Sequence, residues 1–415
     1  MSAQTTESTT TLAQRLRQSS ALVSVLAVVL SLIVGGLLIA LTDERTRGAA
    51  GYFFSRPGDT LSAAWQAASG AYAAMFRGAV FNYNASNGVD MIKPLTETLT
   101  MATPLITASL GVALAFRAGL FNIGAQGQII IGAAMAGYIG FAWQLPWPIH
   151  ILLVVLVAML GGAVWGGLVG WIKARTGAHE VILTIMFNYV AVHLLAYILT
   201  LPAMLRPGSN NPVSPIMQPS AQYPLILGPD FRVHLGFLLG LLATWGVWWL
   251  LERSTIGFEL KAVGANPSAA RTAGINTTRA TVIAMVGAGA LAGLAGAAQV
   301  NGTEFSLANG IAASIGFDAI TVALLGRSKP LGVLFAALLF GAFRAGGVAM
   351  QSQTGTPIDI VLVVQSLIVL FIAAPPLVRT VFGLNARRKR RQAEPDEAPP
   401  GNQPPSSSLT AGSSL

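Results

Sequence analysis

Polar side chains interrupt an apolar stretch of this sequence, and their types and spacing could serve a path across a membrane. Asn122, Gln126 and Gln128 lie among glycines in "FRAGLFNIGAQGQIIIGAAMAGYIGF", residues 116 to 141. Amides cost free energy inside a membrane unless they line a cavity or bond to other groups there. Glycine-interrupted apolar segments are typical of broken helices, whose freed backbone groups line a transport path. The stretch therefore predicts either a solute path or hydrogen bonds that join helices.

A second polar set follows in "HEVILTIMFNYV", residues 179 to 190. Glu180, Thr184 and Asn188 recur every four residues, so they share one face of a helix, with Phe187 beside them. Path lining and helix-to-helix bonding are both open for this face as well. The candidate path residues are, in chain order, Phe121, Asn122, Gln126, Gln128, Glu180, Thr184, Phe187, Asn188, Asn301 and Asp318.

The composition places these residues in a membrane protein. Of 415 residues, 53% are hydrophobic and only 10% are charged, against about 25% charged in soluble proteins. Gly162, Gly166 and Gly170 form a repeated GxxxG pattern, which lets helices approach closely in lipid. The net charge of +9 includes the basic run at 387–391, which lies beside the last apolar segment and favours contact with a membrane surface over nucleic acid.

Metal and disulfide chemistry find no support in the sequence. The chain has no Cys, which excludes disulfides and thiolate metal sites. Its four His residues show no close pairing of the kind that ligates a metal, so we expect structural or path-facing roles for them.

Ten apolar runs approach the length of about 20 residues that crosses the hydrocarbon layer as a helix. We predict an all-α polytopic membrane protein of about ten transmembrane helices, in which broken or short helices line a central path. The predicted spans are 21–41, 95–115, 128–145, 149–172, 181–202, 233–251, 280–300, 316–326, 331–348 and 358–378.

The distribution of Lys and Arg predicts the orientation. With ten spans and the N-terminus inside, seventeen of the 25 Lys and Arg residues fall inside and seven outside, so both termini are expected in the cytoplasm. The expected parts are a cytoplasmic segment at 1–20, a transmembrane domain at 21–380 with a cytoplasmic loop at 253–279, external segments at 42–94 and 203–232, and a basic, then disordered, cytoplasmic tail at 381–415.

That cytoplasmic loop contains a compact polar element, "AVGANPSAARTAGINTTRA", residues 262 to 280. Asn266 suits an N-cap, Pro267 the first helical position and Gly274 the residue just past the end, which predicts a helix of about seven residues. So short a helix is marginal alone in water and needs a surface to lie against. Its small side chains and Arg271 suit docking on a partner, although an ordinary connecting loop is the alternative.

Four stretches together resemble a known family: "AFRAGLFNIGAQGQIIIGA", "EVILTIMFNYVA", "GANPSAARTAGIN" and "GFDAITVALLGRSKPLG". In this order they resemble the membrane permease subunit of bacterial ABC importers, in the branch with ribose, branched-chain amino acid and nucleoside permeases. The likeness is strongest to the nucleoside group and runs from about residue 95 to 380. Two positions depart from the family pattern, Gln126, where an acid is frequent, and His179, where Asn is common.

The resemblance implies a function and a set of partners. The chain would be a multi-pass permease of the bacterial plasma membrane and not an enzyme, carrying a small polar solute, in first place nucleosides. It would work with an ABC ATPase subunit that binds ATP and Mg, with a homologous second permease as a heterodimer, and with an extracytoplasmic lipoprotein that binds the substrate. The short cytoplasmic helix resembles the coupling helix that seats on the ATPase, which assigns that role to Gly264, Asn266, Pro267, Ala270, Arg271 and Gly274.

Other functions have less support. No Gly-Lys dipeptide and hence no P-loop occurs, so the ATPase must be a separate chain, and no HExxH or GxSxG motif indicates an enzyme. A simple sugar such as ribose, or a branched-chain amino acid, is the alternative solute. The alternative mechanism is an ion-coupled secondary transporter, which would need titratable groups within the membrane. The candidates for those groups are Glu180, Glu304, Asp318, Arg344 and Asp359.

Overall fold

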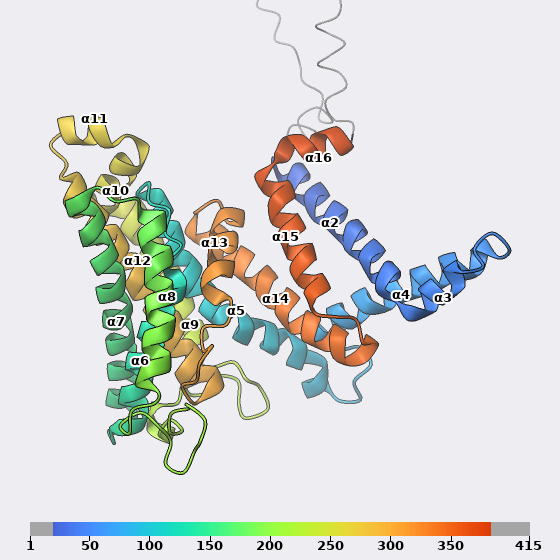
Figure 1. The fold of residues 1–415 in the computed structure, drawn as a ribbon, viewed down its shortest axis with the longest axis horizontal. Coiled ribbons are helices and arrows are strands. Elements are labelled where there is room, and N and C mark those ends of the chain that lie inside the picture. The colour runs from blue at the N-terminus through green and yellow to red at the C-terminus, as the bar shows by residue number, and fades with distance from the viewer. Residues whose placement is uncertain (1–19, 383–415) are drawn as a thin grey trace, which may run out of the picture. The chain divides into compact units, whose positions relative to one another are not determined.

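The computed structural model describes residues 20–382, so the predicted segment at 1–20 and the tail at 381–415 lie almost wholly outside the described residues. Within this range the chain is helical with only isolated β-bridges, which confirms the predicted all-α membrane fold (Figure 1). The helices are α2 (Ser20–Thr42), α3 (Glu44–Ala50), α4 (Pro57–Ala79), α5 (Gly88–Arg117), α6 (Ala125–Ala142), α7 (Trp147–Thr176), α8 (Glu180–Ile198), η1 (Pro219–Ala221), α9 (Leu235–Arg253), α10 (Thr255–Ala265), α11 (Pro267–Thr272), α12 (Thr277–Gln299), η2 (Val300–Glu304), α13 (Ile315–Leu325), α14 (Pro330–Thr354), α15 (Asp359–Ala373) and α16 (Pro375–Val381).

The chain divides into two compact units. The larger comprises residues 27–373 and contains every element discussed below. The smaller joins residues 1–26 to 374–415, of which the start of α2 and helix α16 are described.

Among the described residues, eight helices are long and apolar enough to cross a membrane, and each coincides with a predicted span. They are α2, α5, α6, α7, α8, α9, α12 and α14. The other two predicted spans are shorter helices, α13 with 11 residues and α15 with 15 residues. At 1.5 Å per residue, α13 reaches only about 16 Å, roughly half of the hydrocarbon layer.

The predicted span at 316–326 thus coincides with a helix too short to cross the membrane by itself, and the preceding segment explains why. Residues 305–314 are not helical, because Phe305 (φ 54°), Gly310 (φ 83°) and Ala313 (φ 40°) have left-handed backbone conformations. Such conformations end a right-handed helix. The chain thus continues from η2 through an irregular stretch into a half-helix.

Helix α12 packs against α5, α6 and α7, and close glycine contacts hold it against α7. A Cβ added to Gly162 would lie 2.1 Å from the carbonyl oxygen of Gly289, and one added to Gly166 would lie 2.4 Å from that of Met285. A Cβ on Gly170 would likewise meet the Met285 side chain at 2.9 Å. The GxxxG repeat seen in the sequence therefore lies at a helix–helix contact.

The segment at 42–94, predicted only to lie outside, contains two helices. Helix α4 packs against α14, where a Cβ added to Gly78 would lie 2.0 Å from that of Ala349, and one on Gly346 would lie 2.5 Å from the Met75 carbonyl oxygen. The alanine-rich composition of α4 permits this approach but lacks the hydropathy of a span, which is why the sequence showed no element here.

Replacing Gly162 with Ala tests the packing of α7 on α12. The added methyl group has no room beside Gly289, so we expect a loss of roughly 1–3 kcal/mol in the free energy of unfolding, measured by thermal unfolding of the purified protein. Gly246→Ala on α9 is the matched control, because nothing lies within 4 Å of its Cβ position. Equal melting temperatures for the two variants would contradict the close contact.

Candidate functional site

The first interruption lies between α5 and α6, at residues 118–124, and side-chain amides bond its backbone. The Asn122 carbonyl oxygen accepts from the Gly124 N–H at 2.9 Å, and its amide nitrogen donates to the Gln128 Oε1 at 3.2 Å. Asn188, from α8, accepts from the Gly127 N–H at 2.8 Å and donates to the Ile123 carbonyl oxygen at 2.9 Å. These amides replace the hydrogen bonds that the broken helix lacks.

The second interruption precedes α13, and Gln126 joins it to the first. Its amide nitrogen donates to the Ala313 carbonyl oxygen at 2.6 Å, and its Oε1 accepts from the Gly316 N–H at 2.9 Å. An ionised acid could accept the second bond but could not donate the first. A glutamine amide can therefore make both bonds, the one to Ala313 as donor and the one to Gly316 as acceptor.

The remaining residues of the α8 face are also engaged within the chain. Glu180 forms an ion pair with Lys173 at 2.6 Å, and one of its oxygens accepts from the Phe121 N–H at 3.4 Å. Thr184 bonds back to the carbonyl oxygen of Glu180 at 2.8 Å. Phe187 packs edge-to-face on Trp165, with ring centroids 5.3 Å apart. This face points into the bundle and fastens α8 to α6 and α7.

Phe121 and His179 have distinct local roles. The Phe121 ring stacks on Phe116 at 5.0 Å between centroids, and 41% of the residue is exposed. His179 is the N-cap of α8, since its Nδ1 accepts from the Val181 N–H at 3.4 Å. A capping side chain is what Asn would supply at this position, so the departure from the family pattern keeps the cap.

Two predicted path residues lie away from the amide cluster. Asn301, in η2, donates to the Ala221 carbonyl oxygen at 3.1 Å and lies against Gly140, near the far end of α6 from Gln126. Fourteen residues of helix separate Gln126 from Gly140, about 21 Å. Asp318, in the first turn of α13, forms an ion pair with Arg344 of α14. The structure therefore brings together the predicted residues of α8 with those in and just before α6, and it places Asn301 and Asp318 in separate contacts.

Sequence reasoning missed the partners of Gln126 and of Asp318. Arg344 was the one basic residue inside a predicted span, and a cation within a membrane needs a carboxylate or other partner. That requirement was a signal for an ion pair. The sequence did not indicate the bonds of Gln126 to the backbone at Ala313 and Gly316. Those backbone atoms need a side-chain partner only because the helix is interrupted there.

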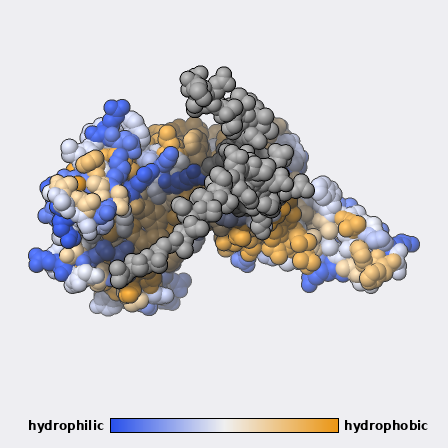
Figure 2. Space-filling view, turned by 90° about the horizontal axis from the view of Figure 1, so that it is seen from above, coloured by the Kyte–Doolittle hydropathy of each residue, from blue (hydrophilic) through white to orange (hydrophobic). Residues whose placement is uncertain are grey.

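The short helix predicted in the loop at 253–279 is present in the structure. Helix α11 runs from Pro267 to Thr272, and the Asn266 side chain accepts from the backbone N–H of Ser268 and Ala269, both at 3.0 Å. Gly274 has a φ of 83°, which suits glycine just past a helix end. Figure 2 shows hydrophilic residues gathered on this face of the bundle.

A docking helix needs exposed residues, and Ala270 and Gly264 are instead packed against the rest of the chain. Ala270 is only 4% exposed and packs into the core, so it anchors α11, whereas Ala269 and Arg271 are exposed. Gly264 packs directly on the first interruption, because a Cβ there would lie 2.2 Å from the Arg117 carbonyl oxygen and 2.9 Å from the Gly119 nitrogen. The loop at 253–279 therefore touches the broken helix.

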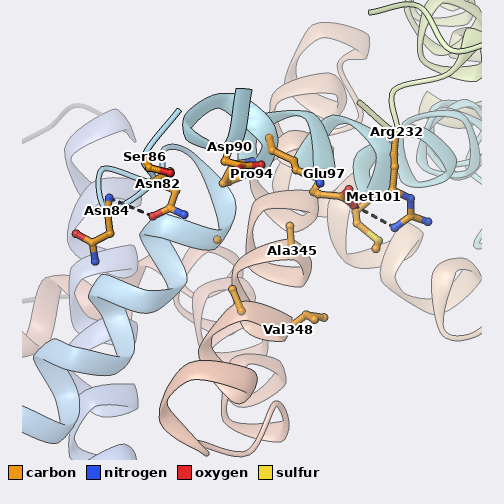
Figure 3. A pocket seen from close by; sticks show the side chains of 14 residues that line it. Asn82, Asn84, Ser86, Asp90, Pro94, Glu97, Met101, Arg232, Ala345 and Val348 are labelled. Carbon is orange, nitrogen blue, oxygen red and sulfur yellow. Dashed lines mark hydrogen bonds and ion pairs between the residues drawn. The ribbon is translucent and has the colours of Figure 1, made fainter. Parts of the chain in front are cut away.

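A cavity of about 610 Å³ opens at the other end of the bundle, between α4, α5 and α14 (Figure 3). Its polar wall includes Asn82 and Asn84 in the turn after α4, where the Asn84 N–H donates to the Asn82 Oδ1 at 3.2 Å. Arg232 reaches in from the loop before α9 and pairs with Glu97 at 3.2 Å. Both loops belong to segments predicted outside the membrane.

The opposite wall of this outer cavity is apolar and comes mainly from α14. Ala345 and Val348 line it, with Met101 from α5 beside them (Figure 3). A cavity with hydrogen-bonding groups on one side and apolar groups on the other suits an amphipathic organic solute. No residue in it was a candidate from the sequence, because the polar members come from loops without a periodic pattern.

Replacing Asn188 with Leu tests the backbone role of the amide cluster. The Gly127 N–H and the Ile123 carbonyl group would lose their partner inside the bundle, so we expect a loss of roughly 2 kcal/mol or more in the free energy of unfolding. Asn210→Leu, at an exposed loop position, is the matched control. If thermal unfolding shows the two purified variants to be equally stable, the amide has no such role.

Comparison with known proteins identifies the family and several relatives of this chain. The family described as "Branched-chain amino acid transport system / permease component" matches residues 95–373. The chain is 38% identical over 295 residues to the guanosine ABC transporter permease protein NupP of Bacillus subtilis, covering 69% of this chain and 83% of NupP. It is 33% identical over 303 residues to the nucleoside ABC transporter permease protein NupB of Lactococcus lactis, covering 70% and 82%.

Other relatives carry different names. The glucose ABC transporter permease protein TsgB13 of Haloferax volcanii is 34% identical over 288 residues, covering 67% of this chain and 75% of TsgB13. Second permeases of the same two bacteria, NupQ of B. subtilis and NupC of L. lactis, match at 28% and 26% identity. No solved structure gives a significant match.

Proposed function

This chain belongs to the branched-chain amino acid transport system permease family, and we propose that it is the permease of a nucleoside importer. As a member of a family of ABC transporter permeases it is a multi-pass transport subunit and not an enzyme. The observation that supports nucleosides is the match to NupP and NupB, each over more than two thirds of this chain. The match to TsgB13 makes a sugar the second candidate.

The arrangement of charges supports a neutral solute and an ATP-driven mechanism. Of the five candidate titratable groups, Glu180 is paired with Lys173 and Asp318 with Arg344, while Glu304 accepts from the Gln299 amide at 3.3 Å. An ion-coupled carrier would need a titratable or ion-binding group free at its path. The amide cluster holds the path walls in place by bonding their backbone, and we propose that the solute passes along its exposed edge, where Phe121 lies.

We further propose the assembly that the resemblance implied. An ABC permease works with an ATPase, which would bind ATP and Mg, and with a substrate-binding lipoprotein outside the cell. The pairs NupP with NupQ and NupB with NupC support a second, homologous permease and hence a heterodimer. The Lys and Arg distribution supports a plasma-membrane orientation with both termini in the cytoplasm.

Solute uptake tests the nucleoside assignment. Cells with and without the gene are given labelled uridine, adenosine, guanosine, ribose, glucose and leucine, and we expect deletion to abolish uptake of one or more nucleosides only. Re-expression of the gene from a plasmid is the control and should restore that uptake. Loss of ribose, glucose or leucine uptake alone would refute the nucleoside assignment and leave the family unchanged.

The role of α11 in coupling is a separate prediction. Because Ala269 and Arg271 are exposed, Ala269→Trp and Arg271→Glu should weaken seating on the ATPase without disturbing the core. We expect ATP-dependent uptake in vesicles to fall by roughly tenfold or more, the effect of losing about 1.4 kcal/mol of docking free energy. Arg45→Glu, which reverses an exposed charge on α3, is the control and should leave uptake unchanged. Normal uptake by both α11 variants would show that α11 does not couple the permease to the ATPase.

A further inference from the structure

Helix α14 leads from the outer cavity directly to a charged contact. Val348 lines the cavity and is 54% exposed. Arg344 precedes it by four residues, so it lies on the same face of α14, one turn or about 6 Å deeper. The helix therefore connects the apolar wall of the cavity to Arg344, the single described Lys or Arg residue that lies inside a predicted span.

Arg344 binds the start of the half-helix α13. Its guanidinium donates to the Ser314 hydroxyl at 2.7 Å and forms an ion pair with Asp318, whose Oδ2 also accepts from that hydroxyl at 3.1 Å. The three side chains thus close a ring between the second interruption and α14. A charged Arg side chain within a membrane is costly without such partners, so separating Arg344 from Asp318 costs free energy.

At this ring of three side chains the surface of the protein carries charged groups, and apolar side chains lie beside and beyond them. The side chains of Arg344 and Asp318 are 22% and 19% exposed, so they reach the surface without projecting from it. Beside and beyond them α13 exposes the apolar residues Phe317 (50%) and Leu324 (44%). Along this face, the apolar α14 wall of the outer cavity is therefore followed by the ion pair and then by the apolar side chains of α13.

We propose that the Asp318–Arg344 pair, with Ser314, is a gate that closes the inner end of the outer cavity. The half-helix makes this possible, because the irregular segment 305–314 lets α13 shift against α14 without unwinding a full span. With the pair broken, the Gln126 amide still holds Ala313 and Gly316, so α13 would pivot about these two bonds and its lower part would move away from α14. The inference rests on the proposed function only in taking the cavity end as the side from which solute arrives.

The absence of Cys from the chain permits a direct test, since an introduced cysteine is the only thiol. Val348→Cys places it above the pair and Leu324→Cys below it, six residues or about 9 Å past Asp318 along α13. A membrane-impermeant charged maleimide is applied from outside to the assembled transporter in sealed vesicles without ATP. We expect labelling at position 348 and none at position 324.

Removing the pair should expose the lower position. In the Asp318→Asn background we expect the labelling rate at position 324 to rise by roughly tenfold or more, and likewise with Arg344→Gln, which breaks the same pair from the other side. The exchanged pair Asp318→Arg with Arg344→Asp should restore protection. A cysteine at Leu242, exposed on α9 away from this route, is the control and should stay unlabelled throughout.

Two outcomes would overturn the gate: labelling at position 324 with the pair intact, or no labelling there in either broken variant. Elution of each variant as an assembled complex shows that the labelling reports the folded protein. The measurement needs no solute, so it is independent of the nucleoside assignment. If the cells do not take up uridine but position 324 is labelled only in the broken variants, the gate proposal stands and the nucleoside assignment fails. If uridine is taken up but the labelling pattern is absent, only the gate proposal fails.

Discussion

Backbone groups inside a membrane must find hydrogen-bond partners within the protein, and this structure interrupts its helices at two places where that requirement is acute. Residues 118–124 and 305–314 leave donors and acceptors without helical partners. Three side-chain amides supply them, from Asn122, Asn188 and Gln126. These amides share the task with other bonds, such as the one from the Ser214 N–H to the Leu307 carbonyl oxygen at 2.9 Å, and the Gln126 amide fixes the point at which α13 begins.

Gln126 makes the two interruptions one structure. It belongs to the first turn of α6, and its amide holds both the end of the irregular segment and the start of α13. On the side predicted to be cytoplasmic, Gly264 lies against the chain at Arg117 and Gly119, where the first interruption begins. A displacement of α10 and α11 would therefore reach the first interruption by direct contact and α13 through Gln126. This is a contiguous route by which a cytoplasmic partner could act on the path.

Local features of this fold were predictable, and contacts between distant segments were not. The capped helix at Pro267–Thr272 follows from neighbouring residues, so its N-cap and its closing glycine were correctly placed. The long apolar spans were predictable for the same reason. The half-length of α13 depends on the backbone conformation of Phe305 and Ala313, which non-glycine residues rarely adopt and which their types do not announce.

Burial inside the bundle was equally hidden from the sequence. Ala270 looked like part of a free docking surface because it is a small residue in the middle of a short, polar helix, yet tertiary packing buries it. The same limit applies to the amides, since the sequence left path lining and internal bonding equally open. The structure shows internal bonds for Asn122, Gln126 and Asn188, and these bonds shape the path rather than contribute free groups to it.

Hydrogen–deuterium exchange of the Gln126→Met variant tests most directly whether a side-chain amide holds the two interruptions together. In the native protein the Gly316 N–H is bonded to Gln126, so its exchange should be slow. The account predicts faster exchange in the variant in peptides covering 313–318 and 123–128, with α7 and α12 unchanged. Unchanged exchange in both peptides would show that the interruptions are held by other contacts and would contradict the account.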